Sequence, residues 1–314
     1  MNLNYVIYLL LAAFFSSCCT SSDGENTFSF LETSEGIEVL DGEDPVLFYQ
    51  KTSKSPNGEF FLNNYIHPLY TLEGDTLTEE FPKDHLHHRG IFWAWHQIYI
   101  DTMSVGDSWI MENVTHEVVA AKTSIDNRSA QISANVSWKS SLYQDEKPFI
   151  DEHTTITVHK AKENYRMIDF EILLKALVPE VFLGGSDNKK GYGGFSARIK
   201  LSENTVFTSA EGQATPQILQ VEAGPWMDFS TAFGDTEKQS GLTILCHTST
   251  ANYVAPWILR QQRSMQNIVF PGREKVKISM DKPTILRYRL IVHRGNAGSI
   301  DIAKLQSEYE KISY

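Results

Sequence analysis

Alternating apolar and polar positions dominate this chain, a pattern typical of half-buried β-strands. In the segment 130–144, one face carries the apolar residues Ile132, Ala134, Val136, Trp138 and Leu142, and mostly polar residues fall on the other. The same alternation recurs in PVLFYQ, HTTITVHK, YRMIDFEILLKAL, GLTILCHT and TILRYRLIVHR. Turn-forming clusters such as KSPNG, LEGD and VFPGRE separate these segments. The pattern predicts an all-β chain of short antiparallel strands.

One helix is predicted, at the C-terminus, where the apolar residues change to a helical spacing. Ser299 is placed to cap it, and Asp301 lies in its first turn. An apolar stripe follows, made of Ile302, Leu305, Tyr309 and Ile312. No repeat or linker divides the chain. We therefore expect a large antiparallel β-sandwich in a single domain, residues 28–314, with the helix packed on it.

The N-terminus resembles an export signal. An apolar run from Val6 to Phe15 precedes Cys18 and Cys19. About ten apolar residues are too few to span a bilayer, which takes roughly 20, but they suit a signal peptide. Residues 15–18 resemble a bacterial lipoprotein cleavage box, although residues 1–5 lack the usual Lys or Arg. We expect a signal peptide at residues 1–18, a lipid on Cys18 and a tether over residues 19–27. The protein would then lie in the periplasm, at the outer membrane or on the cell surface.

Composition narrows the possible partners. With 314 residues, 41% of them hydrophobic, the chain can bury a large core. Its formal net charge of -11 argues against nucleic acid as a partner, because phosphate binding needs a concentrated basic face. The membrane is expected as a partner only through the lipid anchor. If a cysteine at the N-terminus is acylated, Cys246 is left without a disulfide partner, and a chain of this length can fold without one.

Titratable residues are concentrated in the stretch FPKDHLHHRG, which we interpret as a loop that ends at Gly90. It carries Asp84, His85, His87, His88 and Arg89. Three interpretations are open. Two of the histidines could bind a divalent metal with a third ligand from elsewhere, although the H-x-H-H spacing is not diagnostic. One histidine could act as an acid or base, with Asp84 fixing its tautomer. The loop could also be solvated and without function.

The strand predicted after this loop, IFWAWHQIYI, is apolar on both faces, so a central position in a sheet is expected. His96 is then interpreted as part of the scaffold rather than as a ligand. Trp93 is a candidate floor for a sugar ring.

Three further segments are candidates to join the site. The glycine-rich segment GGSDNKKGYGGF carries Asn188 and Tyr192, and its glycines permit tight turns and close backbone approach. His247 follows an apolar strand. Near the C-terminus, Arg287, Arg289 and His293 alternate with apolar residues and could clamp a carboxylate or sulfate, if they are not simply solvated.

Several catalytic signatures are missing from the sequence. It contains no G-x-S-x-G, H-E-x-x-H or C-x-x-C motif and no dinucleotide fingerprint. Two carboxylates among Asp84, Asp187, Glu222 and Asp228 could still pair in space, as in glycoside hydrolases.

The stretch HPLYTLEGDTLTEEFPKDHLHHRGIFWAW resembles a segment of the bacterial PmoA-like family, with its D-H-x-H-H-x-G core. Similar segments follow in the same order: GYGGF, GPWMDFSTAFGDTEKQSGLTILCHTSTANYVAPWILR and LRYRLIVHRG. The chain departs from the pattern at Leu72, where the family usually has Pro, and around His247, where it tends to have D-H-P-x-N.

The resemblance implies an exported β-sandwich protein from bacteria that degrade polysaccharides, with oligosaccharide dehydratase or lyase activity as one proposal. The site residues it implies are Asp84, His85, His87, His88, Arg89, Tyr192 and His247. The family's methane-oxygenase label does not carry over, because a methane monooxygenase subunit crosses the membrane several times and this chain has no spanning segment after its signal.

We therefore expect a carbohydrate-active enzyme, a lyase or dehydratase that acts by elimination on uronate-containing oligosaccharides, unsaturated or sulfated ones included. Histidines and Tyr192 would exchange protons, and substrate would contact Asp84, Arg89, Asn188, Trp93, Arg287, Arg289 and His293. A glycoside hydrolase with paired carboxylates, a non-catalytic sugar-binding lipoprotein and a copper or iron oxygenase are the alternatives. No cofactor is expected, and a divalent metal at His85, His87 or His88 stays open.

Overall fold

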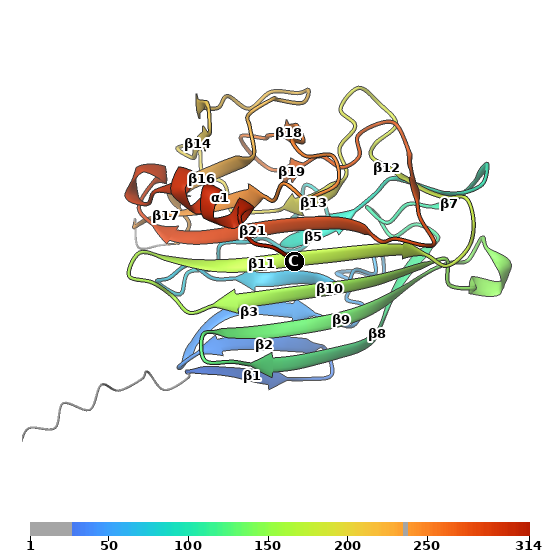
Figure 1. Ribbon diagram of the computed structural model, residues 1–314, viewed down its shortest axis with the longest axis horizontal. Helices are drawn as coiled ribbons and strands as arrows, with labels where there is room; N and C mark the ends of the chain where they lie inside the picture. The colour runs from blue at the N-terminus through green and yellow to red at the C-terminus, as the bar shows by residue number, and fades with distance from the viewer. Residues whose placement is uncertain (1–26, 235–237) are drawn as a thin grey trace, which may run out of the picture.

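The computed structural model describes residues 27–234 and 238–314, so the predicted signal peptide, Cys18 and most of the tether lie outside the described residues. Within the described part, the strands form two large sheets and one small sheet, and all their pairings are antiparallel (Figure 1). In these residues we find no helix whose length and hydropathy would let it cross a membrane.

The first large sheet has eight described strands, in the order β1 (Phe28–Glu32), β2 (Gly36–Asp41), β3 (Asp44–Gln50), β4 (Tyr65–Leu69), β5 (Ile91–Ala94), β13 (Gly194–Ala197), β19 (Gln266–Ile268) and β18 (Trp257–Ile258). The second has nine: β15 (Gly212–Gln213), β14 (Val206–Ser209), β16 (Trp226–Ala232), β17 (Gln239–Cys246), β21 (Thr284–Arg294), β11 (Tyr165–Ala176), β10 (Ile150–His159), β9 (Ser129–Ser140) and β8 (Val114–Ile125). The small sheet contains β20 (Val276–Ile278), β12 (Val181–Gly184), β6 (Gln97–Ile100) and β7 (Met103–Gly106).

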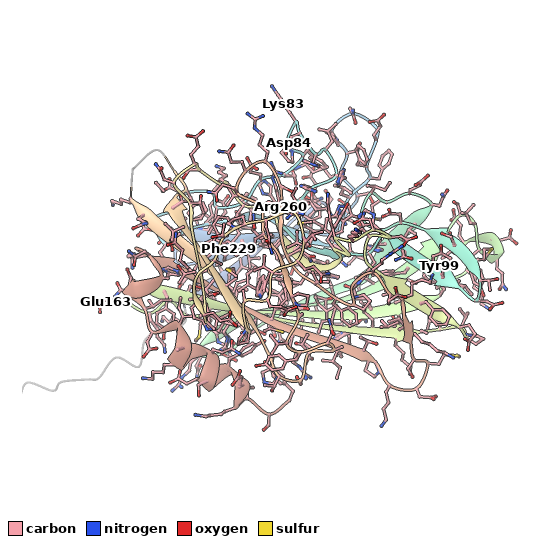
Figure 2. All side chains as sticks on the ribbon, turned by 90° about the horizontal axis from the view of Figure 1, so that it is seen from above. Lys83, Asp84, Tyr99, Glu163, Phe229 and Arg260 are labelled. Atoms are coloured by element: carbon pink, nitrogen blue, oxygen red, sulfur yellow. The ribbon has the colours of Figure 1, made fainter. Side chains whose placement is uncertain are left out.

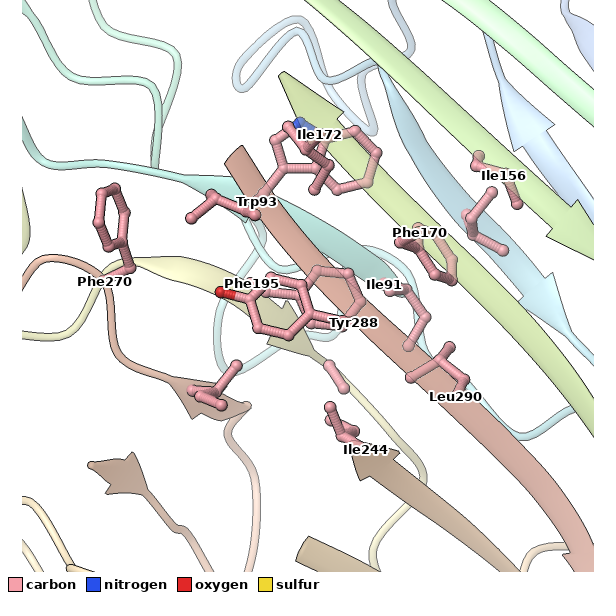
Figure 3. Packing of buried hydrophobic residues seen from close by; sticks show 14 of the residues in the cluster. Ile91, Trp93, Ile156, Phe170, Ile172, Phe195, Ile244, Phe270, Tyr288 and Leu290 are labelled. Carbon is pink, nitrogen blue, oxygen red and sulfur yellow. The ribbon is translucent and has the colours of Figure 1, made fainter. Parts of the chain in front are cut away.

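The main core lies between the two large sheets. Phe195 of the eight-stranded sheet stacks on Tyr288 of the nine-stranded sheet, with ring centroids 4.5 Å apart, and Trp93 meets Phe170 edge-on at 6.3 Å (Figure 3). Alternation along each strand supplies this layer, because every second side chain points inward. The expectation of an antiparallel β-sandwich is confirmed.

Each large sheet also carries a smaller apolar cluster on its outer face. On the eight-stranded sheet, Phe92 and Ala94 belong to the outer cluster, whereas Ile91 and Trp93 belong to the core. On the nine-stranded sheet, Leu245 and Ile291 belong to an outer cluster beneath the C-terminal helix. The protein therefore has two outer faces, on opposite sides of one core.

Helix α1 (Ile302–Glu310) covers the outer face of the nine-stranded sheet (Figure 1). Its N-cap is Asp301, whose carboxylate accepts a hydrogen bond from the backbone N–H of Lys304 at 3.0 Å. Ser299, the expected cap, instead ends the short 3₁₀ helix η2 (Ala297–Ser299); a second such turn, η1, spans Gln144–Glu146. Of the expected stripe, Ile302, Leu305 and Tyr309 are buried, and Ile312 lies beyond the helix, 36% exposed.

The predicted strand 91–100 is in fact two strands in different sheets. It breaks at Trp95 and His96, between β5 and β6. After the break the inward-facing positions change, so that Ile98 joins Trp93 and Trp95 in the main core. His96 therefore lies between the two strands, outside the alternating pattern on which its interpretation as a scaffold residue rested.

Candidate functional site

The histidine loop lies at the head of β5, on the outer face of the eight-stranded sheet. His85 N–H donates to the Pro82 carbonyl and His88 N–H to the His85 carbonyl, each at 2.9 Å, which winds the loop into two turns. The loop ends at Gly90, whose φ of +37° and close approach to the Ile66 carbonyl leave no room for a side chain.

A buried arginine anchors this loop from a neighbouring strand end. Arg198 donates two hydrogen bonds, each 3.0 Å long, to the two oxygens of Asp84, and a third to Glu79 at 2.7 Å. Asp84 also accepts from His85 Nδ1 at 2.8 Å. Partial burial acts in the opposite direction, but the hydrogen bonds from Arg198 and His85 lower the pKa of Asp84 to about 2. Asp84 is thus an ionised group that fixes His85 in one orientation.

The three loop histidines pack against one another. The rings of His85 and His88 are stacked with centroids 4.5 Å apart, and His87 meets the edge of His88 at 4.7 Å. Stacked rings direct their nitrogens alongside each other rather than toward a common point. In residues 27–234 and 238–314 we find no group of three or more His, Cys, Asp or Glu side chains arranged to hold a metal ion.

Two of the loop histidines, His87 and His88, are held in the neutral form. Burial, with the positive potential of His85 and Arg89, lowers the pKa of His87 to about 4. Burial, with the neighbouring His87 and His85, lowers the pKa of His88 to about 2. The Nδ1 atom of His88 lies 3.3 Å from Arg198 Nη1 and accepts from it, since arginine only donates. Near pH 7 these imidazoles are proton acceptors, not cations.

Next to this loop lies a histidine–carboxylate pair. His96 Nδ1 is 2.7 Å from Asp107 Oδ2, and each side chain is less than one fifth exposed. The other Asp107 oxygen accepts the backbone N–H groups of Trp109 and Ile110, which shapes the turn after β7. Because Asp107 accepts the Nδ1 proton, Nε2 of His96 carries the lone pair. Nε2 is buried and has no hydrogen-bond partner among the described residues.

Two aromatic rings enclose His96. Trp109 stacks on it with centroids 5.1 Å apart, and Tyr192 meets it edge-on at 4.9 Å. Tyr192 comes from the glycine-rich segment, which folds back on itself: Ser186 N–H donates to the Tyr192 carbonyl at 2.8 Å. A Cβ on Gly185 would lie 2.3 Å from the Gly191 carbonyl oxygen, so this return requires glycine, as the sequence indicated. Burial and the charge of Asp107 raise the pKa of Tyr192, so its phenol is protonated.

The charge of Arg260 acts on the same phenol. Arg260 is half-buried and donates to the carbonyls of Gln217, Leu259 and Ile218, and its charge acts on Tyr192 in the direction that lowers the tyrosine pKa. Figure 2 shows Arg260 in the interior of the view, with Asp84 toward one margin. Together with the histidine loop, His96, Asp107, Trp109, Tyr192 and Arg260 form what we call the histidine site.

Arg89 does not serve the predicted substrate-binding role. Its side chain is 1% exposed and donates to the backbone carbonyls of His87, Trp109 and Ser108. It also lies over the Phe92 ring, 4.7 Å from the centroid. The guanidinium ties the histidine loop to the Trp109 turn and has no access to a ligand.

Trp93 as a sugar floor was also a wrong prediction. It is 1% exposed in the main core (Figure 3). Its Nε1 donates to the buried Glu152 at 2.9 Å. Asn188 is exposed on the glycine-rich segment, where its side-chain oxygen accepts from Lys190 N–H.

The predicted cationic clamp lies on the opposite outer face, beneath α1, and does not join the histidine loop. Arg287 pairs with Glu171, and Arg289 pairs with both oxygens of Asp169. Their guanidiniums lie over Tyr314 and Tyr309, at 3.9 and 4.4 Å. Figure 2 shows α1 on the side of the molecule away from Asp84. Alternation placed these arginines on one face correctly, but that face holds the helix.

His247 and His293 also belong to this second face. His247 contacts the Tyr309 ring, with centroids 5.0 Å apart, and its Nδ1 lies 2.7 Å from Ser249 Oγ. His293 is fully buried and its Nε2 lies 2.7 Å from Asp228 Oδ1. Neither histidine is near the loop of His85, His87 and His88, so the implied convergence of His247 with that loop is not found.

Three of the four carboxylates considered for a hydrolase are held by other side chains. Asp228 is buried beside His293, Asp187 is exposed and bonded to Arg273 at 2.9 Å, and Asp84 is held by Arg198. Glu222 is exposed on the segment before β16.

Sequence reasoning missed His96, Asp107, Trp109, Arg198 and Arg260 as site residues. The sequence contains a signal for two of them, Asp107 and Trp109. The segment VGDSW places both residues in a turn that begins 11 residues after His96, and the short hairpin of β6 and β7 lies between.

Comparisons with known proteins place the chain in a family but give it no activity. No curated protein matches it. It is similar to a solved structure from Salmonella typhimurium described as a "putative mutarotase (YeaD)", with 8% identity over 86% of this chain and 94% of that one, and a TM-score of 0.35. A score this low establishes neither a common fold nor a common activity. A family model matches residues 36–307, from β2 into α1, and the chain therefore belongs to the family of unknown function DUF6807.

Proposed function

We propose that this protein is an exported carbohydrate-active enzyme, a carbon–oxygen lyase that removes water or a glycosidic substituent from a uronate-containing oligosaccharide. One observation carries the proposal: the ring of His96, which Asp107 fixes, meets the ring of the protonated Tyr192 edge-on, and its Nε2 has no hydrogen-bond partner among the described residues. A base and an acid of different kinds, held close together and partly buried, suit an elimination.

His96 is assigned as the base. Asp107 holds its Nδ1–H, so the Nε2 lone pair is the one available to a substrate proton. Asp107 would also stabilise the imidazolium that forms when His96 accepts that proton. His87, neutral and without a hydrogen bond to another described side chain, is the second candidate for this role.

Tyr192 is assigned as the acid. Its raised pKa keeps the phenol proton in place until the leaving oxygen develops negative charge. Arg260 is assigned to the substrate carboxylate, the role predicted from the sequence for Arg89, Arg287 and Arg289. A cation there would stabilise the enolate-like charge that builds up as the proton leaves.

The proposed reaction balances without a cofactor. His96 takes the proton from the carbon beside the carboxylate, and the electrons of that C–H bond form a C=C bond. The C–O bond at the next carbon breaks, and the leaving oxygen takes the Tyr192 proton. The products are an unsaturated sugar and water or an alcohol. Proton return from His96 to the phenolate restores the enzyme.

A divalent metal at His85, His87 or His88 remains a separate prediction. Elemental analysis of the purified protein tests it, and bound copper or iron that is required for turnover would favour the oxygenase alternative. Export and acylation of Cys18 also remain proposals. Mass spectrometry of the mature N-terminus, in wild type and C18A, tests both.

The experiment that tests the function is a comparison of substrates. The protein is incubated with uronate oligosaccharides whose terminal residues are saturated or unsaturated, and with neutral oligosaccharides of equal length. Elimination from the uronates alone supports the proposal. Cleavage with uptake of water would indicate a hydrolase, and binding without any product would indicate a sugar-binding lipoprotein.

A further inference from the structure

A pocket of about 400 Å³ opens between the two large sheets at one end of the sandwich. Its walls come from the adjacent ends of β2 and β3, the turn after β4, the turn between β10 and β11, and the end of β21. Figure 2 labels Glu163, which follows the lining residue Lys162, at a margin far from Asp84. The pocket is therefore separate from the histidine site, and none of its groups has been used above.

Arg166 gives this pocket an unmade hydrogen bond. Its side chain is 9% exposed, and Nη2 donates to Asp41 Oδ2 at 2.9 Å. Nη1 is buried and has no hydrogen-bond partner among the described residues. Burial lowers the pKa of Arg166 in spite of the charges of Asp41 and Asp44, so the guanidinium is incompletely compensated. A buried donor without a partner is costly, and an acceptor oxygen from a ligand would remove that cost.

The other charged groups differ in how far they are neutralised. Arg294 pairs with Glu73 at 2.7 Å. Lys162 forms no ion pair within residues 27–234 and 238–314, and its ammonium lies 5.2 Å from the centre of the Tyr165 ring. Arg166 and Lys162 thus line the same pocket, and each has capacity for an anionic oxygen.

The rest of the lining suits a hydroxylated ring. Pro45, Val46, Leu72 and Val292 supply apolar surface, which the C–H face of a sugar can cover. Tyr70 and Asp44 lie on the same lining and can exchange hydrogen bonds with hydroxyl groups. The volume falls within the range of small-molecule sites, about 300–1,000 Å³.

We propose that this pocket is a second ligand site, which binds one hexuronate unit through Arg166 and Lys162 and takes no part in the chemistry at the histidine site. Its ligand is defined by a carboxylate for the two cations and by hydroxyl groups for Tyr70 and Asp44. The inference does not depend on the elimination reaction, since it concerns binding alone.

Calorimetric titration with sodium glucuronate tests the proposal, with glucose as the neutral probe. We expect saturable binding of glucuronate and none of glucose. Lys162→Gln should weaken binding about fivefold, because one charge contact with the ligand is lost. Lys175→Gln, at an exposed position on β11 away from the pocket, is the matched control and should leave binding unchanged. Tyr70→Phe is a second lining variant that keeps the Arg166 pair intact.

Arg260→Gln separates the two sites. Glucuronate binding that survives Arg260→Gln and weakens in Lys162→Gln supports the pocket. Binding that is lost in Arg260→Gln and unchanged in Lys162→Gln belongs to the histidine site and overturns the proposal, as does the absence of saturable binding in wild type. Neither result depends on turnover, so failure here leaves the proposed lyase activity to be judged by its own experiment.

Discussion

His96 Nδ1 lies 2.7 Å from Asp107 Oδ2, and this contact determines which nitrogen of His96 carries the lone pair. One Asp107 oxygen shapes the turn that carries Trp109, and the other fixes the imidazole. A single carboxylate therefore holds the backbone of that turn and also fixes the tautomer of His96.

Removal of either member of the pair should abolish most of the activity. We expect His96→Gln to lower kcat by about 10²- to 10⁴-fold, the usual contribution of a general base. Asp107→Asn should lower kcat as well and shift the pH profile, because the imidazole loses its fixed tautomer. His153→Gln changes a partly exposed histidine on β10 and serves as control. Equal kcat in wild type and His96→Gln would refute the assignment of the base.

Tyr192→Phe should lower kcat at least about 100-fold with little change in KM, because the ring is kept and only the phenol proton is lost. Steady-state kinetics on the substrate identified above measure the split. Tyr99→Phe is the matched control, since Tyr99 lies in the small sheet under Lys275 and outside the histidine site. A change in KM alone would assign Tyr192 to substrate binding instead of proton transfer.

Arginine substitutions on the two outer faces should differ in whether they change substrate binding. Arg289→Gln breaks a buried pair with Asp169 and should cost about 3–5 kcal/mol of stability while kcat and KM stay unchanged. Arg260→Gln should raise KM, and it should also lower Tm, because three hydrogen bonds to backbone carbonyls are lost. Arg273→Gln, in an exposed pair with Asp187, should cost only about 0–1 kcal/mol. A raised KM in Arg289→Gln would indicate that Arg289 binds substrate, as the predicted cationic clamp requires.

Stability should fall in mild acid because of the loop histidines. The folded pKa values of His87 and His88 are about 4 and about 2, below the ordinary 6.5. Below pH 6.5 the unfolded chain therefore binds protons that the folded chain does not, so stability decreases as the pH falls from 6.5 toward 4. The limiting slope is about 1.4 kcal/mol per pH unit for each such histidine.

Urea unfolding at pH 7.5, 5.5 and 4.5 measures this slope. His88→Asn should reduce the slope by about 1.4 kcal/mol per pH unit, the contribution of one proton. The stability of this variant at pH 7.5 also changes. His116, whose pKa burial lowers to about 3, should retain its share in that variant. Identical pH dependence in wild type and His88→Asn would contradict the neutral, buried state of His88.

The sandwich could be predicted from the sequence because period-two alternation directly reports which side of a sheet is buried. Alternation also put Arg287, Arg289 and His293 on one face. It could not reveal which outer face this was, because the location of α1 is a property of tertiary packing. The same limit applies to Trp93: an aromatic residue on an apolar strand fits a core and a sugar floor equally well.

His96 was misjudged for a different reason. Its assignment to the scaffold assumed one continuous strand from Ile91 to Ile100, and the chain breaks at His96 to pass from one sheet to another. No turn-forming residue marks that break in the sequence. Asp84 was better predicted, since a carboxylate adjacent to His85 in the chain needs little tertiary information to reach it. The contribution of Arg198, 114 residues away from Asp84, needed the fold.

The most direct test of the account is the mass of the products formed by wild type and by His96→Gln. Uronate oligosaccharides are incubated with each protein, and the products are read by mass spectrometry. Dehydration predicts a loss of about 18 mass units in wild type, one water, and elimination at a glycosidic bond predicts two fragments whose masses sum to that of the substrate. His96→Gln should give neither. Products that together gain one water, or equal turnover by the two proteins, would contradict elimination at the His96–Asp107 pair.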